Sequence, residues 1–439
     1  MGESTYYQIR QQESRGVSPQ EDHRVHTVMN YGFARSIKRV IVVSNSCAVG
    51  GGASKVAIKT AEILSSQTEC EVCFFCGLST PEAEKLLESH GVHVLSMRNL
   101  PYQNRAGKLL PALSGLYDFA AARVLCNLIE EGDPSTTLVH FHSWLHALSP
   151  SPFFAAASCG VRVCVTAHDY FSICPNGGLF DYNRLEKCDR KTLGARCLLC
   201  NCDKRSYIQK LYRCLRYMIQ TRGLKVSRAS LFAISEISEL LLREHDVPGG
   251  VRGMLRNPIS AAEAATVPCN IDRDSFYLYV GRVDPEKGVA LLCEAARLAK
   301  SKLVVIGDGS LMAQLRSEYP EVRFEGWKEF NEIVGYYKSA RAIVIPSLWY
   351  EGSPLVVLEA KALDAGPFIV PTECGASEGI QDGVDGIVFE SGRVDSLAAA
   401  LRTLKDDAVL KRMRMGGNMP AGHSLEEYAK SLLGAYAAC

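Results

Sequence analysis

The stretch RAIVIPSLWYEGSPLVVLEAKAL, residues 341–363, contains the unit from which the rest of the chain is built. After Arg341 the run up to residue 346 is continuously apolar, as is typical of a strand covered on both faces of a parallel sheet. The run 354–364 has the apolar spacing of a helix, and a Gly-Ser-Pro turn precedes it. The stretch therefore predicts a strand, a short turn and a helix, the repeating unit of an α/β fold.

This alternation recurs along two halves of the chain. Apolar runs that predict strands lie at 38–43, 71–76, 137–141, 161–166 and 231–234, and then at 276–281, 302–307, 341–346 and 367–371. Runs with helical spacing lie at 52–66, 117–131, 288–300, 310–318, 329–339 and 354–364. We expect an α/β protein with two doubly wound, Rossmann-like domains that face each other across a cleft, with ligands at the carboxyl ends of the strands.

The domain boundaries follow from a weakly patterned interval at 255–275. We expect the first domain to cover 37–258 and the second to cover 259–410. Residues 1–36 are polar and contain no apolar signal core, so we expect a flexible N-terminal extension. Residues 411–439 should provide a closing helix.

The composition excludes several classes of protein. The chain has 439 residues, of which 47% are hydrophobic and 22% charged, and its net charge is +1. These values are ordinary for a globular protein, and they do not indicate a nucleic-acid-binding protein. No run of about 18 apolar residues predicts a membrane-spanning helix. We therefore expect a cytoplasmic protein whose 17 cysteines are mostly reduced.

The turn and helix start after residue 350 combine groups that suit one kind of ligand. Ser353 suits the N-cap of the helix, which would leave the amides of Leu355 and Val356 free to bind a phosphate. Glu351 lies in the turn and Glu359 in the second helical turn, where their carboxylates can accept hydrogen bonds from hydroxyls. A phosphate beside hydroxyls describes a nucleotide sugar. The spacing alone also fits a solvated loop residue and a charge on the helix surface.

Two other strand ends add cations and glycines. Gly281 ends a predicted strand, and Arg282 and Lys287 follow in the turn, where they could neutralise a diphosphate. Gly51 and Gly52 lie in a loop between a strand and a helix, where glycine lets the backbone approach a ligand closely. The full G-x-G-x-x-G fingerprint is absent, which disfavours a nicotinamide enzyme.

Together these motifs resemble the retaining glycosyltransferases of family 4, the glycogen-synthase-like group with the GT-B fold. The resemblance covers about residues 37–410, and one departure is ALDAGPFIV, where the family often reads Ala-x-Gly-x-Pro. The motifs follow in the family's order: the glycine loop at 50–52, AHDYFSICP (167–175), GRVDPEKG (281–288), GDG (307–309), PSLWYEGSPLVVLEA (346–360) and ECGASEGIQDGVDGIVF (373–389).

The resemblance implies a role for each matching residue. Arg282 and Lys287 would hold the donor diphosphate, and Glu359 the donor ribose. Glu351 would lie near the hydroxyls of the transferred sugar, and His168 would face that sugar from the first domain. Further donor contacts are implied for residues of the glycine loop, the strand ends and the nucleobase position: Gly51, Gly52, Gly281, Trp327, Gly352, Ser353, Leu355 and Val356.

The function implied is retaining transfer of a sugar from a nucleotide-sugar donor to a glycan or lipid-linked acceptor, in cell-surface polysaccharide synthesis. The first domain would take the acceptor and the second the donor, and catalysis would need no metal. The alternative is a non-catalytic binding protein on a degenerate transferase fold, with a zinc module that contacts anionic partners. The intact Arg282, Lys287, Glu351 and Glu359 argue against degeneracy.

A cysteine-rich insertion is expected at 174–202. Cys174, Cys188, Cys197 and Cys200 have spacings that suit the thiolate ligands of a structural zinc ion. Reduced or redox-labile thiols and an iron–sulfur cluster remain as alternatives.

A basic segment follows this insertion. Residues 181–228 hold 13 Lys or Arg against four Asp or Glu, and apolar residues alternate with the bases at helical spacing over 207–220. We expect peripheral contact with anionic lipid at the inner membrane face through 204–228, and a solvated basic helix is the alternative. Nucleic-acid binding would need wider basic stripes with stacking aromatics, so we expect none.

Overall fold

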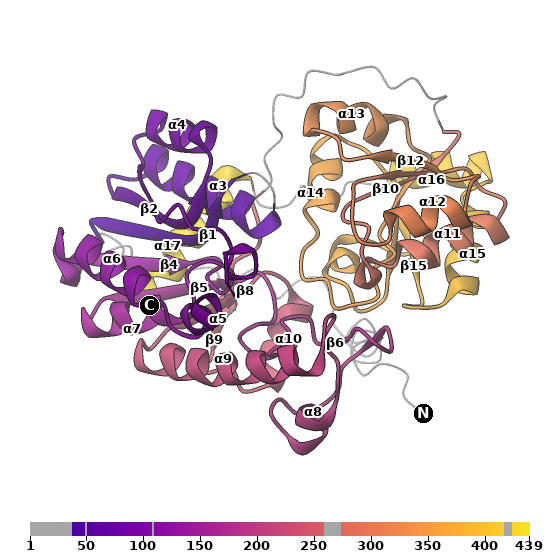
Figure 1. The fold of residues 1–439 in the computed structure, drawn as a ribbon. Coiled ribbons are helices and arrows are strands. Elements are labelled where there is room, and N and C mark those ends of the chain that lie inside the picture. The colour runs from indigo at the N-terminus through magenta and orange to yellow at the C-terminus, as the bar shows by residue number, and fades with distance from the viewer. Residues whose placement is uncertain (1–36, 49–50, 108, 259–273, 417–423) are drawn as a thin grey trace, which may run out of the picture.

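The computed structural model describes residues 37–48, 51–107, 109–258, 274–416 and 424–439. Over these ranges the chain forms two α/β units that lie side by side, each built on its own parallel sheet (Figure 1). The extension expected at 1–36 and the start of the expected second domain, 259–273, lie outside the described residues.

The first unit is built on a 7-stranded parallel sheet with the order β3-β2-β1-β4-β5-β8-β9. This is a doubly wound order, and its switch point lies between β1 and β4, where ligands bind in such folds. The strands are β1 (Arg39–Cys47), β2 (Glu71–Ser79), β3 (His93–Ser96), β4 (Thr137–Phe141), β5 (Arg162–Ala167), β8 (Ser230–Ala233) and β9 (Val251–Met254).

Helices cover both faces of this sheet. On β1, Ile41 and Val43 enter one hydrophobic core, while Val40 and Val42 enter the other, because successive side chains of a strand point to opposite faces. The helices of this unit are α3 (Gly52–Gln67), α4 (Pro81–Ser89), α5 (Leu109–Leu116), α6 (Phe119–Glu130), α7 (Ser151–Ser158), α8 (Ala195–Leu199), α9 (Tyr207–Val226) and α10 (Glu236–Glu244).

The second unit repeats the plan with a 6-stranded parallel sheet in the order β12-β11-β10-β13-β14-β15. Its strands are β10 (Tyr277–Val280), β11 (Leu303–Ile306), β12 (Arg323–Gly326), β13 (Ala342–Val344), β14 (Phe368–Pro371) and β15 (Gly386–Phe389). Its helices are α11 (Val289–Leu298), α12 (Met312–Glu318), α13 (Phe330–Ser339), α14 (Leu355–Ala362), α15 (Val394–Thr403) and α16 (Asp407–Gly416).

The last helix, α17 (Leu425–Ala437), returns to the first unit. Tyr428, Leu432 and Tyr436 are buried in the core on the α3 face of the first sheet, and the Tyr428 hydroxyl lies 2.8 Å from Thr60 Oγ1. The boundary expected at 411 is wrong, because it falls inside α16, whose Met413 packs in the core of the second unit.

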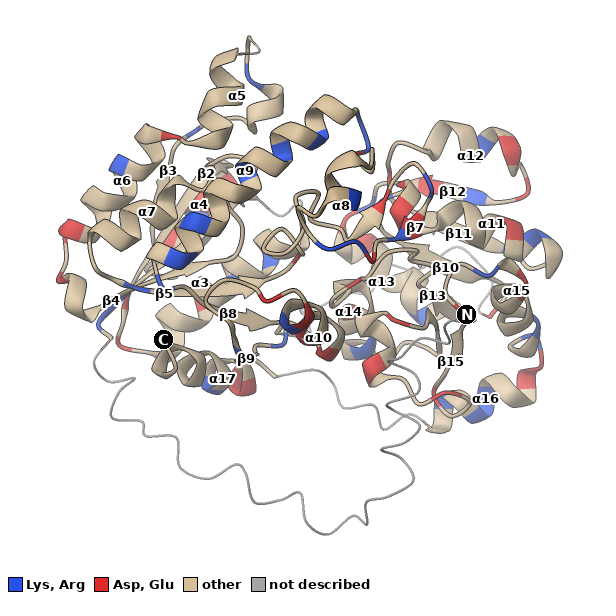
Figure 2. Cartoon of the chain, turned by 90° about the horizontal axis from the view of Figure 1, so that it is seen from below, with Lys and Arg blue, Asp and Glu red and all other residues tan. Residues whose placement is uncertain are grey.

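Polar contacts join the two units below the cleft. A hairpin of β6 (Phe180–Asp181) and β7 (Glu186–Lys187) lies in the cysteine-rich insertion, and Figure 2 shows it beside the second unit. Lys187 Nζ lies 2.7 Å from Glu373. Glu378 accepts a hydrogen bond of 2.9 Å from the Ile237 amide at the start of α10 and pairs with Arg256 at 3.1 Å. Glu378, in the glycine-rich segment after β14, thus joins the two units.

Candidate functional site

A cavity of about 940 Å³ lies between the two units at the carboxyl ends of their strands. This volume is in the range of small-molecule sites, and the position is the one expected for ligands of doubly wound sheets. Every residue that the sequence predicts for donor binding or catalysis lines it: Gly51, Gly52, His168, Gly281, Arg282, Lys287, Trp327, Glu351, Gly352, Ser353, Leu355, Val356 and Glu359.

The turn that carries Lys287 is fixed by a glycine. Gly288 has φ +70, in the left-handed region that favours glycine. A Cβ at this position would collide with the carbonyl oxygen of Pro346, at the end of β13. The close approach of the two turns brings Lys287 next to the loop that carries Glu351. The absence of a side chain at Gly288 therefore permits the approach that brings the two charged groups together.

Lys287 and Glu351 form an ion pair inside the cleft. Lys287 Nζ lies 2.5 Å from Glu351 Oε1, and only 15% and 13% of the two side chains are exposed. Glu351 Oε2 also accepts hydrogen bonds from Ser347 Oγ and, at 3.4 Å, from Trp349 Nε1. Burial raises the pKa of Glu351, but the charge of Lys287 and these hydrogen bonds outweigh it and hold the pKa below its ordinary value. Glu351 is therefore ionised at neutral pH.

Arg282 lies at the cleft with its charge matched by carboxylates. Its guanidinium pairs with Asp284 and, at 3.0 Å, with Glu286 Oε1. Lys204 of the first unit lies 3.3 Å from the same Asp284. Burial lowers the pKa of Arg282, but Glu286 and Asp284 outweigh it and raise the pKa. The Arg282 side chain is 57% exposed, so a diphosphate can reach it and compete with these partners.

Helix α14 points its N-terminus into the cleft. It begins at Leu355 with Pro354 as the N-cap, so the prediction that Ser353 is the cap is wrong by one residue. The amides of Leu355 and Val356 still belong to the first turn, where a helix has no internal acceptor for them. Both residues line the cavity, which makes this helix start a place for an anion.

Glu359 connects the two sides of the cleft. One turn into α14, its Oε1 lies 3.2 Å from Lys55 Nζ of α3, and its Oε2 accepts a hydrogen bond of 3.3 Å from the Tyr337 hydroxyl. Gly51 and Gly52 precede Lys55, and a Cβ at Gly51 would meet no protein atom within 4 Å. A Cβ at Gly52 would contact the Leu355 side chain at 3.6 Å, so of these two glycines only Gly51 borders open space.

His168 belongs to a row of histidines that the sequence analysis did not identify. His168 Nε2 lies 2.9 Å from His142 Nδ1, and the two rings are stacked. Behind them, the two ring nitrogens of His140 contact Tyr436 and Thr166 at 2.9 and 2.8 Å. Burial lowers the pKa of His168 to about 4, so this ring is neutral at neutral pH. The alternating pattern VHFH at 139–142 was a usable signal.

Asp169, next to His168, was also missed by the sequence analysis. It lines the cavity, and burial raises its pKa to about 6. Its Oδ1 accepts a hydrogen bond of 3.0 Å from the Phe171 amide. A carboxyl with a raised pKa in a cleft is a candidate functional group on physical grounds.

The four cysteines expected to bind zinc do not come together. In a zinc tetrahedron the sulfurs are about 3.8 Å apart, given Zn–S bonds of about 2.3 Å. No three of the sulfurs of Cys174, Cys188, Cys197 and Cys200 lie within 4.8 Å of one another in the described structure. Cys197 instead accepts a hydrogen bond of 3.4 Å from Lys210, and Cys200 Sγ donates to Asp181 at 3.3 Å.

One other group of metal-ligand atoms is present in the part of the chain that the structure describes. Cys126, Glu130 and Cys159 have ligand atoms within 4.8 Å of one another, on and beside α6 and α7. The two sulfurs are 2.9 Å apart. This group lies outside the residues that line the cleft.

Comparison with known proteins agrees with this geometry. The family described as "Glycosyl transferases group 1" matches residues 275–407, which include Arg282, Lys287, Glu351 and Glu359. This part of the chain is therefore similar to group 1 glycosyltransferases. An alpha-D-kanosaminyltransferase of Streptomyces kanamyceticus is 32% identical over 181 residues, which are 38% of this chain and 46% of that protein. A glycogen synthase of Mycobacterium tuberculosis is 31% identical over 170 residues, 36% of this chain and 39% of that protein. The chain thus spans less than half the length of these curated relatives.

Solved structures resemble both units in fold. Anabaena Alr3699/HepE in complex with UDP and glucose superposes with a TM-score of 0.62 at 16% identity, over 90% of this chain and 98% of that one. Sucrose-phosphate synthase from Thermosynechococcus elongatus gives 0.62 at 17% identity, over 90% and 97%. The fold of the chain is therefore GT-B, with two parallel-sheet domains.

Proposed function

We propose that the chain is a glycosyltransferase that moves a sugar from a nucleotide-sugar donor to a glycan or lipid-linked acceptor. One observation carries the proposal: Arg282, Lys287 and the free end of α14 converge on one cavity between the two units. Two cations and a helix N-terminus suit a diphosphate, and Glu351 and Glu359 suit the hydroxyls on either side of it. The proposal draws further support from the bound UDP and UDP-glucose of HepE structures.

The charges fit the loss of a diphosphate. As the bond from the anomeric carbon to the phosphate oxygen breaks, negative charge grows on the diphosphate and positive charge on the sugar ring. Arg282, Lys287 and the α14 amides stabilise the first charge, which removes the need for a metal at this step. When the donor binds, Lys287 leaves Glu351 and Arg282 leaves its carboxylates. Both cations then pair with the diphosphate, so neither charge is left without a partner.

We propose that the transfer retains the anomeric configuration. The acceptor hydroxyl forms its bond to the anomeric carbon on the face that the diphosphate leaves, and its proton passes to the departing phosphate oxygen. A covalent route of the kind used by retaining glycosidases would need two carboxyl groups roughly 5 Å apart on either side of the sugar. Before the donor binds, Glu351 is paired with Lys287 and Glu359 with Lys55. In the proposed complex both carboxylates accept hydrogen bonds from hydroxyls of the donor, and neither acts as a nucleophile. His168, neutral at pH 7, can hydrogen-bond the sugar without adding charge.

In this proposal the first unit binds the acceptor. We propose a glycan or lipid-linked intermediate of surface polysaccharide synthesis, used at the cytoplasmic face of a membrane. Among relatives, a lipopolysaccharide 1,2-N-acetylglucosaminetransferase of Salmonella typhimurium is 26% identical over 198 residues, which are 41% of this chain and 46% of that protein.

The test uses nucleotides and then products. Thermal shift with uridine, guanosine, adenosine, cytidine and thymidine diphosphates should give stabilisation by one or two of them, because ligand raises the melting temperature only where a site exists. The shift should disappear in Lys287→Ala. Mass spectrometry should then show a product whose mass is that of the acceptor plus one sugar, when the matching nucleotide sugar and a lipid-linked acceptor are supplied. Stabilisation by a nucleotide, without transfer or hydrolysis of any nucleotide sugar, would favour the non-catalytic binding protein. A lack of stabilisation by every nucleotide would overturn the proposal.

A further inference from the structure

The outer face of α9 is apolar where a helix of a soluble protein is normally polar. Four large apolar side chains follow one another along it at spacings of three or four residues. Their exposed fractions are 79% for Ile208, 44% for Leu211, 44% for Leu215 and 50% for Met218. The opposite side of the helix, with Leu224 among others, is buried against the first unit.

Neighbouring helices enlarge this apolar stripe into a surface. The Tyr212 hydroxyl of α9 donates a hydrogen bond of 2.8 Å to the carbonyl of Ala112 in α5, and Tyr207 donates one of 2.8 Å to Leu198 in α8. Figure 2 shows α5 beside α9, with α8 beyond the start of α9. The exposed large apolar residues of α5 and α8 are Leu109 (73%), Leu110 (77%), Leu113 (53%), Leu198 (37%) and Leu199 (80%), and Phe119 (77%) begins α6 nearby. We call the exposed apolar residues of α5, α8 and α9, with Phe119, the α5–α9 face.

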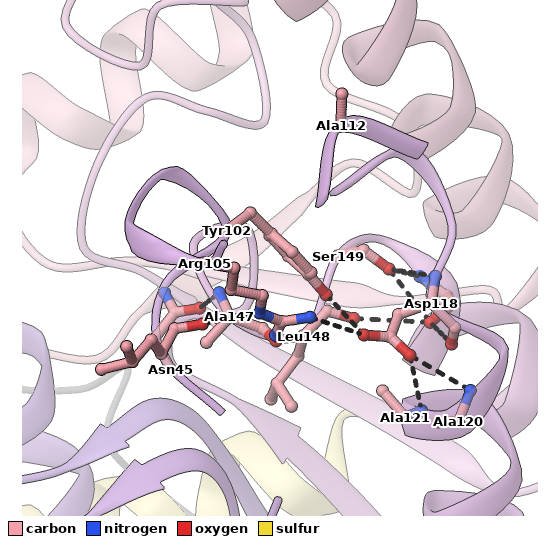
Figure 3. A network of polar contacts seen from close by, with 12 residues as sticks. Asn45, Tyr102, Arg105, Ala112, Asp118, Ala120, Ala121, Ala147, Leu148 and Ser149 are labelled. Atoms are coloured by element: carbon pink, nitrogen blue, oxygen red, sulfur yellow. Dashed lines mark hydrogen bonds and ion pairs between the residues drawn. The ribbon is translucent and has the colours of Figure 1, made fainter. Parts of the chain in front are cut away.

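A buried polar network anchors the segment between α5 and α6, which carries part of the α5–α9 face (Figure 3). Asp118, between α5 and α6, caps α6 by accepting bonds of 3.1 Å from the amides of Ala120 and Ala121. It also accepts a hydrogen bond of 3.0 Å from the Tyr102 hydroxyl, and its own amide donates to Ser149 Oγ at 2.9 Å. The apolar side chains are therefore presented by a fixed part of the fold.

The charge around the α5–α9 face has one sign. From 204 to 228 the chain has eight Lys or Arg and no Asp or Glu. Two of these bases, Lys210 and Arg216, are buried, and Lys204 and Arg213 pair with carboxylates. Arg196 of α8 and Arg222 and Lys225 of α9 are exposed, and among the described residues none of the three forms an ion pair. Figure 2 shows Lys or Arg segments in blue along α9 and beside α8.

We propose that the α5–α9 face docks on the surface of a bilayer that contains anionic lipid. Apolar side chains with unpaired bases among them match an interface whose interior is apolar and whose headgroups are negative. A second copy of the chain fits less well, because a symmetric contact would bring like charges together. The bases also disfavour an apolar protein partner.

The contact is with the surface and does not span the membrane. No single described helix is long and apolar enough to cross a bilayer, although α5 and α6 pass as a bent pair by length and composition. In α6, however, Leu125, Leu128 and Ile129 are buried in the first core. That helix cannot leave the fold to cross a bilayer.

Docking through this face would bring the cleft close to the membrane. The role of docking in sugar transfer rests on the proposed function. Lys204, two residues before the N-cap of α9, lies 3.3 Å from Asp284 beside the donor turn. The α5–α9 face thus ends at the rim of the cleft. An acceptor anchored in the bilayer by a lipid would reach the cavity from this side.

The test is co-sedimentation of the full chain with vesicles. Wild type should bind vesicles of equal phosphatidylglycerol and phosphatidylcholine, and should bind phosphatidylcholine alone at least tenfold less. Ile208→Ser/Leu211→Ser/Leu215→Ser should weaken binding on the order of a hundredfold, because three exposed apolar side chains that would be buried in the bilayer are removed. Arg222→Gln/Lys225→Gln should weaken it about 25-fold, roughly fivefold for each cation.

Matched controls lie in the second unit. Leu298→Ser/Met415→Ser removes apolar side chains that are 45% and 77% exposed, and should leave vesicle binding unchanged. The melting temperature of every variant shows whether it is folded, and its nucleotide thermal shift shows whether the donor site is intact. A variant that passes both tests and no longer binds vesicles has lost docking alone. Donor turnover without vesicle binding would overturn this inference and leave the proposed function standing. A wild-type dimer that the triple variant converts to a monomer, with no vesicle binding, would identify the α5–α9 face as a contact between copies and overturn it too.

Discussion

The buried ion pair between Lys287 and Glu351 allows a quantitative test of the site. Lys287→Met keeps most of the side-chain volume but removes the charge, which leaves the Glu351 carboxylate with Ser347 and Trp349. Removing one member of a fully buried pair costs about 3–5 kcal/mol. Here the side chains keep 15% and 13% exposure, and two hydrogen bonds remain on the carboxylate. We expect a loss of about 2–3 kcal/mol in the free energy of unfolding at pH 7.

The loss should depend on pH, and its sign follows from the pKa. In the wild type the pKa of Glu351 is below 4.5, because Lys287 and the hydrogen bonds outweigh burial. The stability from this carboxylate is present above pH 4.5 and disappears as the pH falls through the lower folded pKa. Without Lys287 the effect of burial dominates and the folded pKa rises. The deficit of the variant should then grow as the pH rises from about 4.5 toward 7.

The assay is urea unfolding at several pH values, followed by the fluorescence of Trp349 and the other tryptophans. Lys287→Met/Glu351→Gln supplies the control, because it leaves no buried charge. The double variant should be more stable than Lys287→Met at pH 7 and should lose the pH dependence. Equal stability of wild type and Lys287→Met at pH 7, or a double variant no better than the single one, would refute a buried, coupled pair.

Two further predictions concern the geometry around the cleft. Gly288→Ala should destabilise the protein by about 2–4 kcal/mol, because it combines a left-handed backbone with a collision. The control is Gly392→Ala, which has φ +77 but no atom within 4 Å of its Cβ and should cost about 1 kcal/mol. Equal losses of the two variants in thermal unfolding would contradict the close approach at Pro346. His142→Phe keeps a ring in place but removes the nitrogen that lies 2.9 Å from His168. Donor turnover should fall about tenfold, while the Kd of the nucleotide stays unchanged. An unchanged kcat would show that His168 needs no positioning partner.

The sequence located the central strands because their environment is uniform. The run 137–141 coincides with β4, and the other eight predicted runs each overlap a strand. The four strands of the two large sheets that were missed, β3, β9, β12 and β15, are the four sheet edges. An edge strand is paired on one side only and is less covered, and three of these four have no continuous apolar run; the exception, β15, reads GIVF and is only four residues long. HVLS at β3 and RFEG at β12 are examples, and each begins with an exposed residue.

The residues of the site also fall into those that the sequence predicted and those that it did not. Arg282, Lys287, Glu351 and Glu359 could be named from the sequence because each lies at a strand end or in the first turns of the following helix, and the α/β order brings strand ends together. The row of His142 and His168 depends on neighbouring strands and left only a weak local pattern. Glu378 joins two units that are far apart in sequence, so no local signal could show its role.

Local residue order thus determined the kinds of element, their order and the charges at the strand ends, since these follow from interactions over a few residues. Tertiary structure alone decided which side chains share a space. It separated the four cysteines that spacing had grouped, and it placed α17 on the first unit. It also turned the apolar side of α9 outward, while Gln220 and Leu224 on its other side are buried.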